Sequence, residues 1–533
     1  MIGGLILAGV VIMCCIAFNK ISEKVGLPAL LLFILLGMLF GSDGIFKIPF
    51  DNYSFAEKIC SIAMIVIIFY GGCGTKWEQA KKVAVKSILL SSAGVITTAG
   101  FVGVFCHIIL KFSWIEGLLI GAVISSTDAA SVFSVLRSKK LNLKYKTASI
   151  LELESGSNDP WAYMLTVIIL SVMHGDPTSG NFFSILFSQI FFGLLFGIII
   201  SIAGALCLKY IKFDSDGFDA IFVCGIAVLS YALPAICGGN GYLSTYIVGI
   251  VIGNTKVNNK KSLIHFFDGV TGFAQILVFF LLGLLATPSQ IPQIIIPALA
   301  IVLFLTVFAR PLSVFLIMKP FGSKLNQILL ISWAGLRGAT SIVFAIMVTV
   351  DSAYTKNDIF HIVFLIVLIS IGFQGTFLPL IARKLNMIDS NENVMKTFSD
   401  YSDETEVQFI RISVDEDGDW SGKEIKDITL PHGILIVMVL RSNSKIIPDG
   451  KTVLNTGDIL VLCAPRFYDD TAFILNEIIL DEQNAWCGKT LAEISTSDDQ
   501  LIVMIKRNGK TLIPNGQLRL QENDSLVMTS EKK

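Results

Sequence analysis

Runs of apolar residues, separated by short charged or Pro/Gly-rich breaks, fill the chain as far as Arg383 and Lys384. Because a membrane-spanning helix needs about 20 mostly apolar residues, this pattern predicts a polytopic α-helical membrane protein with about 13 transmembrane helices. The candidate helices cover residues 2–19, 27–45, 56–74, 84–110, 115–137, 147–173, 181–208, 217–237, 239–254, 264–287, 290–318, 325–350 and 357–382.

Lysine and arginine residues are distributed unevenly among the loops between these candidate helices. The odd-numbered loops, together with the segment after the last helix, carry 20 of them, whereas the even-numbered loops carry 4. Basic residues concentrate in the cytoplasmic loops of membrane proteins. We therefore expect a multi-pass protein of the cell (plasma or inner) membrane, with its N-terminus outside and its C-terminal tail in the cytoplasm.

Composition and charge support a division into a membrane part and a soluble part. Of the 533 residues, 53% are hydrophobic and 16% are charged, against roughly 25% charged in a soluble domain. The net charge of −1 is the sum of two unlike parts, because residues 1–384 hold 26 basic and 17 acidic residues and the remainder holds 15 and 25. This composition argues against a soluble enzyme. The ten cysteines and five histidines show no metal-binding spacing, and we expect no cofactor and no nucleic-acid partner.

The tail follows an acidic linker at residues 385–406 and repeats itself with an offset of 66 residues. At least twelve identical residues align at this offset, among them Trp420 with Trp486, Arg441 with Arg507 and Asp458 with Asp524. Short β-branched runs alternate with Pro-Asp-Gly or Pro-Asn-Gly turns in each copy. We predict a transmembrane domain at residues 1–384, followed by two cytoplasmic α/β regulatory modules at residues 407–468 and 469–533.

The fifth apolar segment is interrupted by the polar sequence Ser125-Ser126-Thr127-Asp128. These residue types compete for backbone hydrogen bonds and favour helix ends over helix interiors. We predict a helix break near Thr127, where freed carbonyls can ligate a cation and Asp128 can cap the second half-helix. The alternative is a continuous helix whose small polar residues pack against a neighbour.

The sixth segment carries Glu154, Ser155, Asn158 and Asp159 just before Pro160. A spacing of four residues, as between Glu154 and Asn158, places side chains on one face of a helix. Carboxylate, hydroxyl and amide oxygens together suit a hard monovalent ion, and they are too few in formal charge for a dedicated calcium site. The alternative is a polar loop between two helices.

The twelfth segment contains Arg337 between Gly335 and Gly338. A guanidinium group stays charged, so inside a membrane it needs an acidic partner. We expect a structural ion pair of Arg337 with Glu154, which leaves Asp159 as the unpaired titratable group. The alternative is that Arg337 snorkels to the membrane surface. The glycines also predict a second helix break seven helices after the first, which places the two broken helices in opposite orientations, as inverted repeats require.

Thr127-Asp128, the run from Glu154 to Pro160 and the run Gly335-Leu-Arg337-Gly together resemble the monovalent cation:proton antiporter-1 superfamily. Within it, the cell-volume-regulation potassium/proton antiporters are similar over all the predicted helices and also carry a regulatory tail. This resemblance implies inverted repeats with two broken, crossing helices. It also implies a homodimer built from a dimerisation domain and a six-helix core domain that moves like an elevator.

The resemblance also implies roles for individual residues. The ion- and proton-binding residues are Asp159, Asn158, Ser155, Thr127 and Asp128, and the monovalent cation is held by Asp159, Ser155 and the Thr127 backbone. Glu154 and Arg337 are the stabilising ion pair. An asparagine before the binding aspartate is similar to the electroneutral members. One departure is that Tyr70 precedes Gly71-Gly72 where this branch usually has an acidic residue, which leaves no third-helix carboxylate there.

The duplicated tail resembles the C-terminal regulatory module of potassium-transport systems. No G-x-G-x-x-G motif precedes it in the tail, so the nucleotide-binding half that often accompanies this module is not expected. The resemblance implies a small regulatory ligand, such as a cyclic dinucleotide. The alternative is a module that serves stability or assembly.

These observations lead to an expected function. The chain is expected to be a secondary active antiporter that exchanges cytoplasmic potassium (or sodium) for external protons in ion and pH homeostasis. Exchange is electroneutral and proceeds by alternating access, with cation and proton competing for Asp159. A tail-gated cation channel is one alternative, although the Thr-Val-Gly-Tyr-Gly filter of potassium channels does not occur in the sequence. A sodium-coupled anion symporter is the other.

Overall fold

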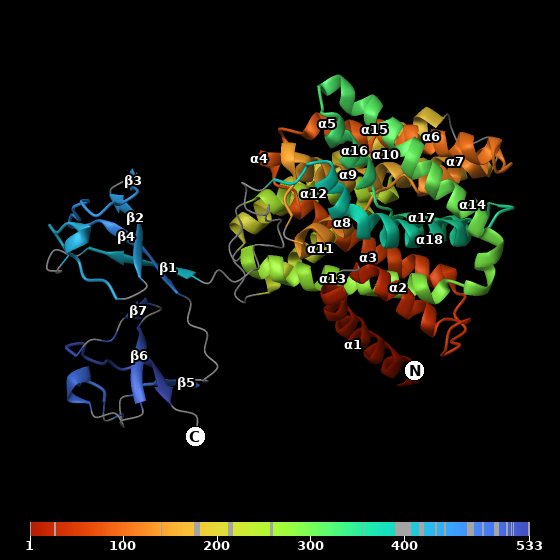
Figure 1. Cartoon of the computed structure of the whole chain (residues 1–533). Coiled ribbons are helices and arrows are strands. Elements are labelled where there is room, and N and C mark those ends of the chain that lie inside the picture. Colours follow the sequence, from red (N-terminus) through yellow and green to blue (C-terminus); the bar gives the residue numbers. More distant parts are fainter. Residues whose placement is uncertain are drawn as a thin grey trace. The chain divides into compact units, whose positions relative to one another are not determined.

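The chain folds into two compact units, residues 1–403 and residues 404–533 (Figure 1). The computed structural model describes residues 2–25, 28–139, 141–174, 182–211, 217–255, 260–353, 355–389, 407–414, 420–431, 434–441, 444–465, 474–481, 484, 486–494, 500–507, 510–512, 514 and 516–530. Most of the predicted acidic linker, residues 390–406, therefore lies outside the described residues.

The first unit is helical throughout its described residues, apart from the connections and one isolated bridge. Its helices are α1 (Ile2–Val25), α2 (Ala29–Phe40), α3 (Tyr53–Gly74), α4 (Trp77–Ala80), α5 (Ala84–Ser91), α6 (Ala93–Ile108), α7 (Trp114–Val123), α8 (Ala129–Ser138), α9 (Thr147–Met173), α10 (Phe182–Tyr210), α11 (Phe218–Ile236), α12 (Gly241–Asn254), α13 (Lys260–Leu285), α14 (Ile291–Phe304), α15 (Arg310–Met318), α16 (Leu325–Trp333), α17 (Ala339–Val350), α18 (Ile359–Ile369) and α19 (Thr376–Lys384).

Each apolar segment predicted from the sequence is occupied by helix. By length and composition, seven described helices are long and apolar enough to cross a membrane, and five more apolar helices of 10–17 residues are shorter. The predicted fifth and twelfth segments are each split into two helices, α7 with α8 and α16 with α17. The π-helical segments η3 (Leu305–Ala309) and η5 (Ser370–Gly375) lie within the eleventh and thirteenth segments, and such widened turns are frequent at functional sites.

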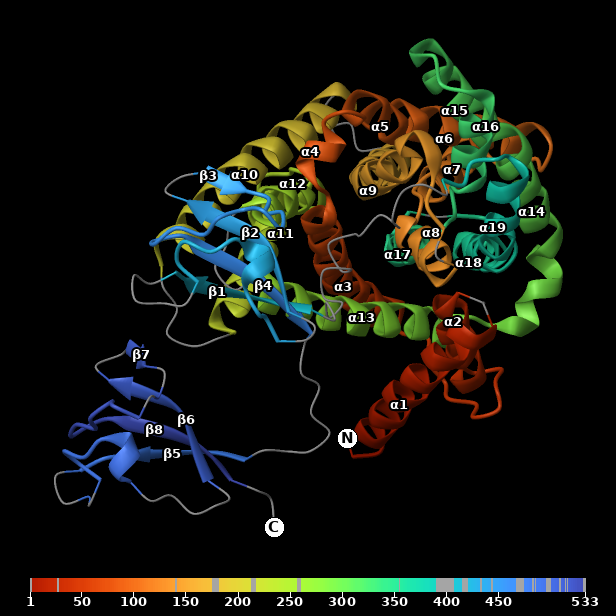
Figure 2. The same ribbon diagram turned by 60° about the vertical axis from the view of Figure 1, so that its left-hand side comes forward.

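The helices pack in two groups (Figure 2). In one group α12 packs on α3, α10 and α11, and α13 packs on α2 and α3. The other group gathers α5 to α9 with α14 to α19. Glycines allow close backbone contact inside the first group, because a Cβ on Gly72 would lie 3.1 Å from the Cα of Gly249. Close helix packing at small residues is typical of membrane proteins.

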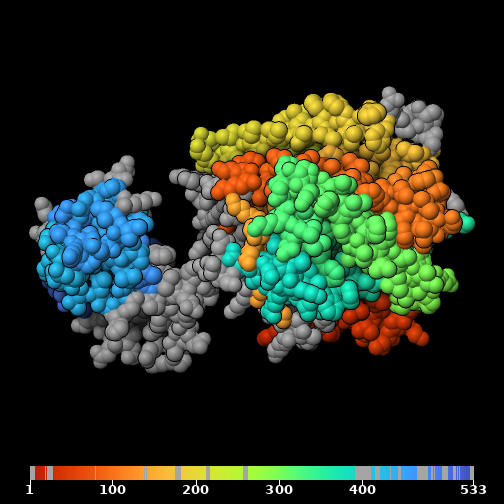
Figure 3. All heavy atoms as spheres, turned by 45° about the horizontal axis from the view of Figure 1, so that its top comes forward, coloured from red at the N-terminus to blue at the C-terminus, as the bar shows by residue number. Residues whose placement is uncertain are grey.

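Helix α10 forms a continuous apolar ridge along one side of the first unit (yellow in Figure 3). Phe183 is 74% exposed and Phe187 is 66% exposed, and Ile198 and Ile202 are also exposed. An uninterrupted apolar surface of this kind is unstable in water. The ridge therefore fits contact with lipid chains or with another apolar protein surface.

The second unit contains two antiparallel sheets with the same strand order, β1-β4-β2-β3 and β5-β8-β6-β7. In the described residues each sheet is accompanied by one 3-10 turn, Ile425–Asp427 in the first copy and Leu491–Glu493 in the second. The strands are β1 (Val407–Ser413), β2 (Leu435–Arg441), β3 (Ser444–Ile446), β4 (Ile459–Pro465), β5 (Ile474–Ile479), β6 (Gln500–Arg507), β7 (Lys510–Leu512) and β8 (Ser525–Ser530).

The sequence repeat in the tail corresponds to a repeated ion pair. In the first copy Arg441 donates from Nε and Nη2 to the two carboxylate oxygens of Asp458, at 2.9 and 2.7 Å. Arg507 makes the same two hydrogen bonds to Asp524, both at 2.7 Å. Both aspartates are buried. Two of the residues that recur at an offset of 66, the arginine and the aspartate, therefore form the same ion pair in each module and satisfy a buried carboxylate.

Candidate functional site

The break in the fifth segment separates α7, which ends at Val123, from α8, which begins at Ala129. Asp128 caps α8, because its carboxylate accepts hydrogen bonds from the Ser131 amide at 3.3 Å and from the Ser131 hydroxyl. A carboxylate also interacts favourably with the positive end of a helix dipole. The break and its cap agree with the sequence prediction.

The break in the twelfth segment lies directly against the first one. The Asp128 amide donates to the Leu336 carbonyl at 2.8 Å. A Cβ on Gly338 would collide with the Asp128 side chain, so a glycine is needed where the two chains cross. The two broken helices thus cross at their non-helical segments, which is the arrangement that the paired breaks predict.

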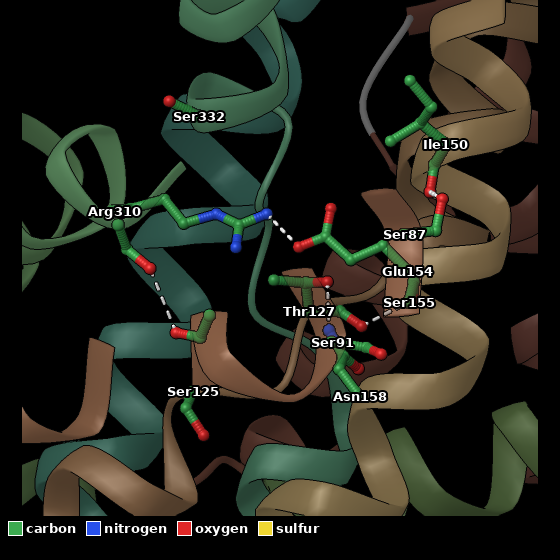
Figure 4. Close-up of polar contacts among 12 residues, drawn as sticks. Ser87, Ser91, Ser125, Thr127, Ile150, Glu154, Ser155, Asn158, Arg310 and Ser332 are labelled. Atoms are coloured by element: carbon green, nitrogen blue, oxygen red, sulfur yellow. Dashed lines mark hydrogen bonds and ion pairs between the residues drawn. The ribbon is translucent and has the colours of Figure 1, made fainter. Parts of the chain in front are cut away.

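Helix α9 runs without interruption through Pro160 and presents one polar face to the first break. The Ser155 hydroxyl donates to the Thr127 carbonyl at 2.7 Å, and Asn158 Nδ2 donates to the Thr127 hydroxyl at 2.6 Å (Figure 4). Asn158 is 1% exposed, and its Oδ1 has no hydrogen-bond partner among the described residues. An unpartnered buried oxygen is costly unless a ligand or water completes it.

Asp159 lies where α9 meets both breaks. Its Oδ1 accepts a hydrogen bond from the Ser126 hydroxyl, and the side chains of Asp128 and Thr340 are close to it. The residue is 9% exposed. No ion pair of Asp159 is seen in the described part of the chain. Ser126 lies in the break that the sequence predicts, but its contact with Asp159 was not predicted.

The expected ion pair between Glu154 and Arg337 is wrong. Glu154 pairs instead with Arg310, whose Nη2 donates to Glu154 Oε1 (Figure 4). Both side chains are buried, at 4% and 1% exposure. The sequence did hold a signal for Arg310, because it is the only charged residue between residues 291 and 318. A lone ionisable residue in an apolar run is a functional candidate.

Arg337 has a different task. Its Nη1 donates to the carbonyls of Ser125 and Ser126, at 2.8 and 2.9 Å, and its amide donates to the Ser370 hydroxyl at 3.0 Å. At 1% exposure it does not snorkel to a surface. These carbonyls lie at the end of α7, where the helix dipole is negative. A cation there satisfies carbonyls that the break leaves without helical partners, which is why Arg337 contacts backbone rather than Glu154.

The arrangement brings all the predicted binding residues together. Asp159, Asn158, Ser155, Thr127 and Asp128 gather at the crossing. Their donors are oxygen atoms, which suit a hard monovalent cation. Among the described residues no group of three or more His, Cys, Asp or Glu side chains could hold a metal ion.

Tyr70, which stands where the resembled branch has an acidic residue, hydrogen-bonds to a carboxylate from another helix. Its hydroxyl donates to Asp268 Oδ1 of α13 at 3.2 Å. A carboxylate is therefore present beside this end of α3, although it is not supplied by α3.

Two protein families match the chain. The sodium/hydrogen exchanger transmembrane family matches residues 9–384. The TrkA-C domain family matches twice, at residues 409–466 and 475–533.

Several known proteins are similar in sequence. The K(+)/H(+) antiporter NhaP of Alkalimonas amylolytica is 32% identical over 98% of this chain and 95% of its own length. The K(+)/H(+) antiporter NhaP2 of Shewanella sp. (strain MR-4) is 34% identical over 84% of this chain and 78% of its own. A probable Na(+)/H(+) antiporter 2 of Methanocaldococcus jannaschii is 28% identical over 62% of this chain and 80% of its own.

A solved structure shares the fold. The sodium proton antiporter MjNhaP1 from Methanocaldococcus jannaschii at pH 8 superposes with a TM-score of 0.63 over 72% of this chain and 99% of that one, at 24% identity.

Proposed function

The chain belongs to the sodium/hydrogen exchanger family, and we propose that it exchanges cytoplasmic potassium for external protons across the cell membrane. It is a cation/proton antiporter with two TrkA-C domains. Potassium is favoured over sodium because the two relatives named as K(+)/H(+) antiporters match 98% and 84% of the chain, whereas the sodium relative matches 62%. Its N-terminus lies outside and its tail in the cytoplasm, as the basic loops indicate.

The observation that carries the mechanism is the different pairing of two buried carboxylates on α9. Glu154 is held by Arg310, whose guanidinium stays charged. Among the described residues, Asp159 accepts hydrogen bonds from hydroxyl groups and forms no ion pair. A proton or a cation can therefore bind to Asp159 without breaking an ion pair. The proton and the cation compete for the same oxygen atoms of Asp159. The site carries one of them across the membrane in each direction.

The charges at the crossing support electroneutral exchange. Asp128, Glu154 and Asp159 are opposed by the two guanidinium groups of Arg310 and Arg337, which gives a net charge of −1 when all are ionised. One monovalent cation or one proton makes this cluster neutral. Because buried net charge is costly in a membrane, the neutral loaded states are the ones expected to cross.

Cation coordination is proposed to involve the oxygens that face Asp159. The Thr127 carbonyl and Ser155 hydroxyl now bond to each other, and Asn158 Oδ1 has no hydrogen-bond partner among the described residues. A bound ion would engage Asp159 together with Ser155 and Thr127, and Asn158 Oδ1 is free to join them. Asp128 stays a helix cap that fixes the second half-helix.

The decisive test replaces the shared carboxylate. Asp159→Asn should abolish potassium-driven proton movement in proteoliposomes monitored with a pH-sensitive dye, because an amide neither binds a proton near neutral pH nor offers a charge to a cation. Asp219→Asn is the matched control, since Asp219 is also buried but lies in the first turn of α11, where it accepts a hydrogen bond from the Ala220 amide. Measurable exchange by Asp159→Asn would refute the proposal.

Ion preference and charge balance can be read in the same proteoliposomes. We expect potassium to drive proton movement at lower concentration than sodium. We also expect the rate not to change when a membrane potential is imposed with an ionophore that does not carry the tested ion. A rate that follows the potential would contradict one-for-one exchange.

The tail is proposed to regulate exchange in response to a small cytoplasmic ligand, with a cyclic dinucleotide as the first compound to test. The crossing is built from residues of the first unit. A chain truncated after Lys384 should keep exchange but lose any response to the ligand. Unchanged activity and an unchanged pH profile, with and without ligand, would leave the tail as a stability or assembly module.

The protein is also proposed to be a homodimer, as the resemblance implies. The exposed apolar ridge of α10 supplies a surface that could bury against a second copy. Native mass spectrometry from detergent should show a dimer, and a purely monomeric active protein would reject this.

A further inference from the structure

Glu116 ties the start of one broken helix to the loop that leaves the other. It is the third residue of α7, and it is 5% exposed. Its Oε1 accepts from the amides of Lys356 and Asn357, at 2.5 and 3.3 Å, and its Oε2 accepts from Asn357 Nδ2 at 3.1 Å. Lys356 and Asn357 lie in the loop between α17 and α18.

Gln327 makes the corresponding contact at the other end of the crossing. It is the third residue of α16, and it is 4% exposed. Its Nε2 donates to the Tyr145 carbonyl at 3.1 Å and to the Thr147 hydroxyl at 3.2 Å. Tyr145 and Thr147 lie where the chain passes from α8 into α9, and Tyr145 has a left-handed backbone with φ of 58°. A non-glycine residue in this conformation must be held by its surroundings.

The two contacts are related by the inverted symmetry of the broken helices. In each, the third residue of the first half-helix binds the segment that follows the second half-helix of the other. Their chemistry is opposite, because Glu116 only accepts hydrogen bonds and Gln327 donates through its amide. Between them lies the third attachment, where the Asp128 amide bonds to the Leu336 carbonyl.

We propose that Glu116 and Gln327 are a pair of positioning residues that hold the two broken helices in register and so shape the cation site at their crossing. Neither touches Asp159 in the structure, so each acts through the helix that carries it. With both ends tied, neither half-helix can slide along its axis. Freed at one end, α7 or α16 can shift relative to the other, and the break between 124 and 128 shifts with it.

This shift should weaken the binding of a cation more than the binding of a proton. A proton needs one carboxylate oxygen, whereas a cation needs several oxygens at fixed distances. Loosening either contact therefore raises the cation KM at a fixed pH. A residue with a merely structural role would lower the amount of active protein and hence the maximal rate, but it would leave the KM unchanged.

The test measures cation KM and maximal rate in proteoliposomes with matched amounts of full-length protein. Glu116→Ala and Gln327→Glu should each raise the cation KM about tenfold or more, because each removes more than one hydrogen bond that involves a charged or buried group. Gln327→Glu places a carboxylate against the Tyr145 carbonyl, so two acceptors face each other. Lys356→Gln is the control, because only the backbone of this exposed residue is used, and its KM should match the wild type.

A swap provides the rescue. Glu116→Gln turns an amide group toward the side-chain amide of Asn357, so two donors face each other and the cation KM should rise. The double variant Glu116→Gln with Asn357→Asp restores an acceptor to each donor. Its KM should return to within about twofold of the wild type. If Glu116→Ala does not fold, Asn357→Ser can replace it, because it removes only the side-chain hydrogen bond to Glu116. We expect this variant to raise the cation KM by a smaller factor.

Unchanged KM values in Glu116→Ala or Asn357→Ser and in Gln327→Glu, with correctly folded protein, would overturn the inference. An equal rise in Lys356→Gln would also overturn it. The inference rests on the proposed site at Asp159 but fails separately from it, because exchange retained by Asp159→Asn would reject that site whatever the KM values of these variants.

Discussion

Two buried carboxylates on α9 differ in whether an ion pair holds them, because they meet different neighbours. Glu154 and Asp159 are both buried on α9, but only Glu154 meets a guanidinium, and that group comes from α15. Asp159 meets hydroxyls at the crossing. The division of labour between a permanently paired acid and an exchangeable one is therefore set by which distant helix each side chain faces.

Breaking the buried pair should be costly. Arg310→Met leaves Glu154 buried without its partner, and we expect a loss of about 3–5 kcal/mol in the free energy of unfolding. Glu154→Gln combined with Arg310→Met removes both charges and should recover most of that loss. Thermal unfolding in detergent measures both, with Arg383→Met at the end of α19 as a control. An Arg310→Met protein as stable as the wild type would contradict the assignment of the pair.

Gly338 is the position where the crossing tolerates no side chain. In Gly338→Ala the added Cβ would overlap with Asp128, so one of the breaks must move. Overpacking of this kind costs roughly 1–3 kcal/mol, and we expect the exchange rate to fall about tenfold or more. Gly225→Ala is the control, because a Cβ there meets nothing within 4 Å. Equal rates for the two variants would show that the crossing is not tight.

At the scale of helices, the π-helical segments η3 and η5 form a chain of hydrogen bonds that ends at the second break. Behind Arg337, the Ser370 hydroxyl bonds to Gln374, and Gln374 Nε2 donates to the Thr306 hydroxyl at 3.0 Å. Ser370 and Gln374 lie in the π-helical segment η5, and Thr306 lies in η3. The widened turns of two neighbouring helices therefore face each other through a polar chain that ends on the second break. Sequence patterns do not mark such turns.

A hydrogen bond from α12 to α9 is one of those that join the two groups of helices near the site. Asn240, the N-cap of α12, donates from Nδ2 to the Pro160 carbonyl of α9 at 2.7 Å. Asn240→Ser keeps a capping oxygen for α12 but is too short to reach Pro160. The loss of about 1 kcal/mol should shift the population toward other arrangements of the two groups by roughly fivefold.

Hydrogen exchange of the full-length protein measures this shift. Peptides from α9 should exchange faster in Asn240→Ser, while peptides from α2 and α13, which pack within one group, should not change. The Asn240→Asp variant keeps the cap but lacks the donor, so it should behave in the same way. Unchanged exchange in α9 for both variants would mean that the hydrogen bond does not hold the groups together.

At the scale of the whole molecule, the chain combines an apolar unit with a tail whose stability depends on charge. Hydrogen bonds from Arg441 hold the pKa of Asp458 below its usual range, against the opposing effect of burial. Burial alone would raise the pKa of Asp524, but the hydrogen bonds from Arg507 and the Gln521 amide outweigh it and leave that pKa below its usual range. Each module thus carries a buried carboxylate that its arginine stabilises in the ionised form.

These lowered pKa values fix the sign of a pH dependence. A carboxylate whose pKa is lower in the folded state contributes stability above the unfolded-state value of about 3.9, and this contribution is lost as the pH falls through the folded value. The protection of tail amides from hydrogen exchange, measured relative to the unstructured rate at each pH, should therefore stay high down to about pH 4 and fall below it. In Asp458→Asn the first module should lose this acid-dependent step, while the second module keeps it. A tail that loosens already between pH 7 and pH 5 would contradict this account.

Much of the fold follows from the sequence because its signals are local. Apolar runs locate the helices, and the polar residues of the fifth segment and the glycines of the twelfth locate both breaks. The tail repeat identifies Arg441 and Asp458 in advance as residues that matter in both copies. Such patterns are readable because helix length, helix caps and turns depend on residues close together in the chain.

The partners of the buried charges could not be read in this way. Whether Glu154 meets Arg310 or Arg337 depends on how α9, α15 and the second break pack, over sequence separations of more than 150 residues. The contact of Ser126 with Asp159 and the contacts of Glu116 and Gln327 also depend on how separate helices pack, and no local pattern predicts them. The sequence by itself determined the helices, the two breaks and the residues that could exchange an ion. Only the tertiary structure decided which charge is neutralised and which stays available, because that choice depends on distances across the fold.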